Sequence, residues 1–201
     1  MRRIASVISA PTDDFLRIWH DTFDKQLKGD LPNDQATIQH ICQALNVPVE
    51  DEQIKTAARI KFDIAKREIT TLRGDAEEVL LYLKSKGYKI GLISNCSYET
   101  PIIWKEVPLA SLVDVAVFSC LVGVVKPDPR IYQIATEQLD VQPQRCLYVA
   151  DGMGQELVSA SNLGMHAVQI FVPGEDEYEP YREEWNGPVI SSLREVLTLV
   201  R

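Results

Sequence analysis

The sequence predicts a doubly wound α/β fold, in which a parallel sheet is covered by helices on both faces. From residue 74 onward, short continuous runs of Val, Ile and Leu alternate with helical patterns, as a sheet buried on both faces requires. Residues 12–70 show helical periodicity alone. The chain has 201 residues, of which 45% are apolar, so it is long enough to bury a sizeable core.

The first third of the chain is expected to form three helices. Thr12 is the expected N-cap of the first helix, which ends at Gly29. Its shared apolar face carries Phe15, Ile18, Trp19, Phe23 and Leu27. The second helix begins near Asn33, and the third runs from about Glu50 to Thr70. Because no strand pattern separates these helices, they predict a small helical unit.

The rest of the chain alternates strands with helices. Strands are expected at residues 88–94, 113–119, 146–151 and 166–172, and helices at 76–86, after 98, at 128–139, at 155–163 and near 193–197. Residues 173–188 are acidic and rich in turn residues. Their charges are expected to be solvated, with a lid or a partner surface as the alternative.

Charge and cysteine content argue against several classes of protein. A net charge of −8 without a Lys/Arg cluster disfavours a nucleic-acid partner, because phosphate backbones are bound by basic surfaces. The four cysteines contain no CxxC pair, so neither a zinc knuckle nor a short disulfide framework is expected. No run approaches the ~20 apolar residues of a membrane span, and no secretory leader is evident. We therefore expect no membrane partner and a cytoplasmic location.

Polar residues follow two of the predicted strands in a pattern that suits phosphate binding. Ligands of wound sheets bind at the carboxyl ends of the strands. Ser94 and Asn95 end the first strand and offer a hydroxyl and backbone N–H groups to an anion, with helix capping as the alternative. Lys126, held by Pro127 just before a helix start, can direct its ammonium into the same crevice.

A third strand ends at Asp151, which is followed by a glycine-rich turn and then by Glu156. Two carboxylates at this spacing suit Mg²⁺, which is held by few protein ligands and several waters. Asp151 is the expected direct ligand, and Glu156 is expected to orient a coordinated water or to pair with Lys126. Taken alone, Asp151 has a helix N-cap as its alternative role.

These segments resemble motifs of the haloacid-dehalogenase-like (HAD-like) hydrolases. LISN at 92–95, VVKPDPRIY at 124–132 and VADGMGQEL at 149–157 are similar to the second, third and fourth motifs of that family, within a likeness that spans residues 12 to about 172. The resemblance implies three parts, namely an atypical N-terminal segment at 1–11, a helical cap at 12–73 and a Rossmann-type α/β core at 74–201.

The resemblance also implies a chemistry. In it, the Ser94 hydroxyl binds a phosphoryl oxygen, Lys126 neutralises the phosphate and the nucleophile, and Asp151 holds Mg²⁺. Most members of the family hydrolyse phosphomonoesters, so the implied substrate is a small phosphorylated metabolite and the implied intermediate an aspartyl-phosphate. Dehalogenation needs no metal, and the Asp151/Glu156 pair therefore favours a phosphatase, with a haloacid dehalogenase as the alternative.

The family's first motif, DxDGT, is missing from this sequence. Counting back from Ser9-Ala10-Pro11 puts the attacking Asp at or before Met1 and puts Arg3 where the second Asp belongs. The first core strand is thus missing or atypical, which predicts a gap in the sheet unless Ile4–Ile8 form a substitute strand. Binding of Mg²⁺ is expected to be weak or absent in the chain as given.

Three accounts of this departure stay open. The sequence is a fragment or has its start placed too late, or it is a natural non-catalytic relative that binds a phosphorylated ligand or a protein. In the third account an unrecognised nucleophile replaces the family's Asp, and Asp13 and Asp14 are the first candidates because they follow the N-terminal segment closely.

Overall fold

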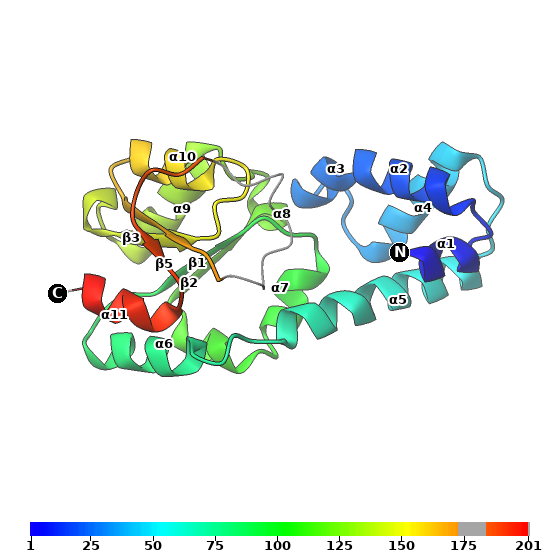
Figure 1. Cartoon of the computed structure of the whole chain (residues 1–201). Helices are drawn as coiled ribbons and strands as arrows, with labels where there is room; N and C mark the ends of the chain where they lie inside the picture. Colours follow the sequence, from blue (N-terminus) through cyan, green and yellow to red (C-terminus); the bar gives the residue numbers. More distant parts are fainter. Residues whose placement is uncertain (173–183, 201) are drawn as a thin grey trace. The chain divides into compact units, whose positions relative to one another are not determined.

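The computed structural model describes residues 1–172 and 184–200, which fall into two compact units (Figure 1). The first unit contains Met1–Thr71, Asn95–Val107 and Phe118–Gly123, and the second contains Leu72–Ser94, Pro108–Val117 and the described part of Val124–Arg201. The domain boundaries expected at residues 11 and 73 stay a prediction. Most of the acidic segment 173–188 lies outside the described residues. Within them, no helix has both the length and the apolar character to cross a membrane.

The first unit is a group of helices around one apolar core. Its elements are α1 (Arg2–Val7), α2 (Thr12–Asp21), α3 (Phe23–Leu27), α4 (Asp34–Leu45), α5 (Asp51–Thr70), α7 (Glu99–Trp104) and α8 (Ser119–Val122). The core is formed mainly by the first five of these helices, and its fully buried side chains include Ile4, Ile8, Phe15, Ile38 and Ile41. The expected helical unit is therefore present over residues 12–70, and it also includes α1.

The alternative of a substitute strand at Ile4–Ile8 is wrong, because Ile4–Val7 lie in helix α1 and Ile8 is its C-cap. Ile4, Ala5 and Ile8 recur at helical spacing, and all three are fully buried in the core of the first unit. The Gln53 side chain of α5 donates a hydrogen bond of 2.8 Å to the carbonyl of Val7, which satisfies an acceptor at the end of the helix. The apolar residues of this segment therefore recur with the period of a helix and not with that of a strand.

The expected first helix differs in two details. Pro11 takes the N-cap position and Thr12 is the first helical residue. The helix is interrupted at Thr22, whose hydroxyl donates to the carbonyl of Trp19 at 2.9 Å, so α2 and α3 are separate. This interruption changes the direction of the following side chains, and Phe23, expected on the buried face, is 51% exposed.

Helix α4 begins with a side-chain cap. The Asn33 side-chain oxygen accepts a hydrogen bond of 2.9 Å from the backbone N–H of Ala36, as expected of a residue just before the helix. We expect Asn33→Ala to lower the free energy of unfolding by about 1 kcal/mol, measured by urea denaturation. Gln35→Ala, an exposed change in the same helical turn, is the control and should have little effect. Equal losses for both variants would contradict the capping role.

The second unit contains the strands, in two sheets within the described residues. β1 (Gly91–Ser94) pairs with β2 (Val115–Phe118), and β3 (Leu147–Ala150), β4 (His166–Ile170) and β5 (Val189–Ile190) form a parallel sheet in that order. Helices α9 (Pro129–Leu139) and α10 (Glu156–Asn162) lie on one side of the strands, and α6 (Ala76–Ser85) and α11 (Val196–Leu199) on the other (Figure 1). The predicted doubly wound α/β fold is confirmed.

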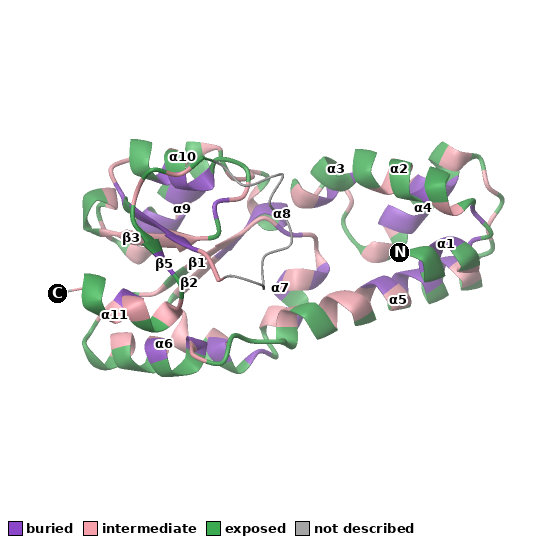
Figure 2. Ribbon diagram, in the orientation of Figure 1, coloured by how far each residue is buried: buried purple, intermediate pink, exposed green. Residues whose placement is uncertain are grey.

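Strands β1 and β3 lie at sheet edges in the described chain, although their sequences suit covered strands. All four residues of β3 are half-buried, whereas four of the five residues of β4 are buried (Figure 2). Continuous apolar runs such as Leu147–Ala150 are typical of strands with neighbours on both sides and helices on both faces. Within the described residues the two sheets are separate, and that a first core strand is missing or atypical stays a prediction.

Candidate functional site

Lys126 and Glu156 form an ion pair in the second unit. The Lys126 Nζ lies 2.5 Å from the Glu156 Oε2, and the two side chains are 18% and 2% exposed. Lys126 occupies the turn before α9, where Asp128 caps the helix by accepting from the backbone N–H of Arg130. Glu156 is the first residue of α10. Because Glu156 is almost inaccessible while Lys126 still reaches the surface, the pair fixes an ammonium at the edge of the interior.

The Glu156 carboxylate is held by further donors. The Tyr148 hydroxyl of β3 donates to Oε2 at 2.8 Å, and the backbone N–H of Gly152 donates to Oε1 at 3.2 Å. Burial by itself raises the pKa of Glu156, but the charge of Lys126 and the side-chain hydrogen bonds with Lys126, Asp151 and Tyr148 outweigh burial, so the net shift is downward. The pKa of Tyr148 is raised by burial and by the charge of Glu156. Glu156 is therefore a fixed anion that holds Lys126 in place.

Tyr132 of α9 completes the support of this pair. Its hydroxyl donates to the backbone carbonyl of Glu156 at 3.0 Å, and its ring meets that of Tyr148 edge to face, with centroids 5.3 Å apart. The sequence-based interpretation missed both tyrosines. The available signal was a tyrosine three residues before Asp151, inside a strand that is otherwise aliphatic. The hydroxyl of a tyrosine in such a strand needs a hydrogen-bond partner in the interior, and Glu156 is that partner.

Asp151 directly follows β3 and is exposed at the surface. Its Oδ1 accepts from the backbone N–H of Met153 at 3.1 Å, and the Gln169 side chain of β4 donates to its carbonyl at 3.1 Å. Desolvation by nearby protein atoms and then a hydrogen bond with Glu156 raise the pKa of Asp151, while the Lys126 charge opposes the shift. Asp151 thus presents a carboxylate beside Lys126 at the end of the strand.

The two carboxylates do not make a complete magnesium site by themselves. Both oxygens of Glu156 already accept hydrogen bonds from protein donors, so Glu156 is not free to serve as a direct ligand. Asp151 supplies one carboxylate. Among residues 1–172 and 184–200, no group of three or more His, Cys, Asp and Glu side chains is arranged to hold a metal ion. The residues present therefore do not fit Mg²⁺ without a further donor.

Ser94 and Asn95 lie at the end of the other sheet. Ser94 is the last residue of β1 and is half-buried, and Asn95 follows it. The structure brings Lys126, Asp151 and Glu156 together through α9, β3 and α10. β1 and β3 belong to separate sheets. The convergence of Ser94 with Lys126 and Asp151 on one crevice therefore stays a prediction.

Comparison with known proteins gives several matches. The chain is 34% identical to (S)-2-haloacid dehalogenase 4A of Burkholderia cepacia, over 56% of this chain and 50% of that protein. It is 34% identical to glyceraldehyde 3-phosphate phosphatase of Methanothermobacter thermautotrophicus, over 45% of this chain and 41% of that protein. The matches thus span half or less of these relatives' length.

Among solved structures, a HAD family enzyme from Bacteroides thetaiotaomicron, crystallised with magnesium and inorganic phosphate, superposes with a TM-score of 0.57. The superposition covers 85% of this chain and 89% of that protein at 19% sequence identity, so it supports the fold alone. The family comparison is more specific, because it matches the chain from residue 7 to residue 164, a range that includes the motifs at 92–95, 124–132 and 149–157. This chain belongs to the haloacid dehalogenase-like hydrolase family.

Proposed function

We propose that the site around Lys126 serves the hydrolysis of a phosphomonoester on a small phosphorylated metabolite. The observation that carries the proposal is the ion pair of Lys126 with Glu156, which fixes an ammonium beside the exposed carboxylate of Asp151. An ammonium with a fixed position binds a phosphoryl group with little loss of side-chain freedom. The similarity to a glyceraldehyde 3-phosphate phosphatase supports a phosphorylated substrate.

In this proposal the residues of the chain bind and orient the phosphoryl group. Lys126 neutralises charge on the transferring group, and the Ser94 hydroxyl and the backbone N–H groups after it donate to its oxygens. Glu156 does not touch the substrate, and it orients Lys126. The attacking carboxylate of an aspartyl-phosphate mechanism is not assigned to any residue of this sequence.

A strand between β1 and β3 is the proposed source of that carboxylate. Both strands have apolar sequences and lie at sheet edges in the described chain, so each can accept a neighbour. An acidic residue at the carboxyl end of such a strand would lie beside Asp151 and would supply both the nucleophile and a second oxygen donor for Mg²⁺. Without it, Asp151 is a single ligand and metal affinity should be weak.

Two other functions have specific support. The incomplete magnesium donor set favours a non-catalytic module that binds a phosphorylated ligand, because Lys126 and Ser94 can act without a nucleophile. The similarity to (S)-2-haloacid dehalogenase 4A favours dehalogenation of a haloacid. Release of halide from a 2-haloacid, compared with release of phosphate from a phosphomonoester, separates dehalogenase from phosphatase. Binding of phosphate with neither reaction indicates the binding module.

The proposal is tested by the affinity for inorganic phosphate. Lys126→Ala should weaken phosphate binding by about 2 kcal/mol, the typical loss when a charge-assisted hydrogen bond is removed. Isothermal titration calorimetry measures the phosphate affinity of the original chain and of the Lys126→Ala variant, at a temperature where circular dichroism shows both to be folded.

Lys84→Ala is the matched control. Lys84 lies in the same unit, pairs with Asp114 at 2.5 Å and carries the same charge, but it is on α6. This variant should bind phosphate as tightly as the original chain. Equal affinities of the original chain and the Lys126→Ala variant would refute the assignment of Lys126.

A further inference from the structure

Lys61 lies on the buried face of α5, where the helical pattern calls for an apolar residue. It follows Ile54, Ala57 and Ala58 at core-facing spacing, and its side chain is 4% exposed. A lysine is almost never fully buried unless it is paired. The position therefore has a reason beyond packing, and its partners identify that reason.

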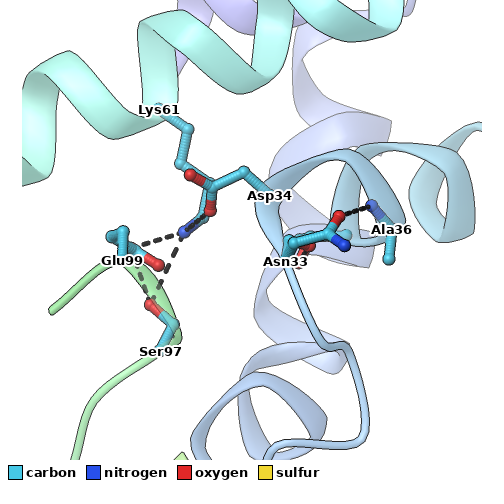
Figure 3. Close-up of polar contacts among 7 residues, drawn as sticks. Asn33, Asp34, Ala36, Lys61, Ser97 and Glu99 are labelled. Carbon is cyan, nitrogen blue, oxygen red and sulfur yellow. Dashed lines mark hydrogen bonds and ion pairs between the residues drawn. The ribbon is translucent and has the colours of Figure 1, made fainter. Parts of the chain in front are cut away.

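The Lys61 ammonium joins separate segments of the first unit (Figure 3). Its Nζ lies 2.6 Å from the Asp34 Oδ1 at the start of α4, 2.5 Å from the Glu99 Oε1 at the start of α7 and 3.5 Å from the Ser97 Oγ. The Trp19 ring of α2 lies below it, with its centroid 5.9 Å away. One side chain thus ties residues 97–99 to three helices.

The residues that Lys61 holds come directly after the predicted phosphate-binding pair Ser94-Asn95. A second tie fixes the same segment, because the Ser119 hydroxyl accepts from the Cys96 backbone N–H at 2.9 Å and donates to the Cys96 carbonyl at 3.3 Å. The Ser97 hydroxyl donates to Glu99 Oε1 at 2.7 Å. The backbone that leads away from Asn95 is therefore held at consecutive residues by buried groups.

The cluster is costly for a purely structural device. Two carboxylates share one ammonium, and burial together with the Glu99 charge raises the pKa of Asp34 to about 6, although Lys61 opposes that shift. Among the described residues, the second oxygen of Glu99 is buried without a hydrogen-bond partner. An unpaired polar atom in a buried network is costly, so the cluster is not explained by stability alone.

We propose that Lys61 is a positioning residue, which holds segment 95–99 in the conformation that binds phosphate without touching the phosphate itself. This inference rests on the proposed function, in which Asn95 helps to bind phosphate. Whether Lys61 holds the segment can be measured separately. A preorganised binding segment raises affinity because no ordering is left to occur on binding. Loss of Lys61 should thus lower phosphate affinity and free the segment.

The test compares three variants of the full chain. Lys61→Met should reduce the affinity for inorganic phosphate about tenfold and raise amide hydrogen exchange in residues 95–99 by a similar factor. Asp34→Asn/Lys61→Met/Glu99→Gln removes the uncompensated charges, so it should recover thermal stability but neither affinity nor exchange protection. Lys66→Met is the control, because Lys66 lies on the same helix and pairs with Glu106 at 2.6 Å, with both side chains exposed. It should leave phosphate affinity and exchange in residues 95–99 unchanged.

Each outcome decides the proposal. Recovery of phosphate affinity together with stability in the triple variant would show that the cluster only stabilises the fold, and the positioning role would be wrong. An unchanged affinity of Lys61→Met for phosphate would also show that the positioning role is wrong. If the original chain binds no phosphate, the proposed function fails instead, and hydrogen exchange then decides whether Lys61 holds the segment. If hydrogen exchange in residues 95–99 of Lys61→Met is no faster than in Lys66→Met, Lys61 does not hold the segment and the positioning role is wrong as well.

Discussion

Glu156→Ala should lower the free energy of unfolding by about 3 kcal/mol or more, among the largest losses expected from a single substitution in this chain. The change removes the counter-ion of Lys126 and leaves the Tyr148 hydroxyl and the Gly152 N–H without their acceptor. Each unsatisfied buried donor costs about 1–3 kcal/mol. Urea denaturation followed by circular dichroism gives the difference between the variant and the original chain.

Two further variants isolate the cause of this loss. Glu156→Gln keeps the shape and one acceptor, so it should lose less stability than Glu156→Ala. Glu137→Ala removes an exposed glutamate from α9 and should change stability very little. A loss in Glu156→Ala no greater than that in Glu137→Ala would show that the ion pair does not stabilise the second unit.

Much of the fold could be predicted from periodicity because burial requires it. Apolar runs located the four longer strands of the described residues to within a few residues, and the start of α4 lies where it was expected, near Asn33. Periodicity failed at residues 4–8, where a short apolar run fits both a strand and a helix and only tertiary contacts with α5 decide. It also failed at Phe23, because nothing in the pattern marked the interruption at Thr22.

The candidate site was only partly predictable for a similar reason. Lys126 and Asp151 stand out in the sequence, since each is a charged residue directly after a short apolar run. Tyr148 and Lys61 do not stand out in this way, because an aromatic residue in a strand and a lysine in a helix are both common. Their roles depend on partners far along the chain, at Glu156 and at Asp34 and Glu99, and single-sequence patterns do not contain these pairings.

The second large effect concerns catalysis. We expect the chain as given to hydrolyse a generic phosphomonoester no faster than buffer with Mg²⁺ does. An amino-terminal extension that carries an apolar strand ending in DxDGT should raise the rate by at least about a thousandfold, because a positioned attacking oxygen contributes far more than the remaining electrostatics. Ser94 is no substitute, since its proposed role is to hold the phosphoryl group. An extension with Asn in place of its first Asp is the control and should stay inactive.

The most direct test of the account is the rate of p-nitrophenyl phosphate hydrolysis with Mg²⁺, measured for the chain as given, the extended chain and the extended chain with Asp151→Asn. The account predicts activity in the extended chain alone, because the added carboxylate would be the attacking group and Asp151 would be needed beside it to hold Mg²⁺. Equal rates for the chain as given and the extended chain would contradict it. The nucleophile would then have to be a residue already present, with Asp13 and Asp14 the first to substitute.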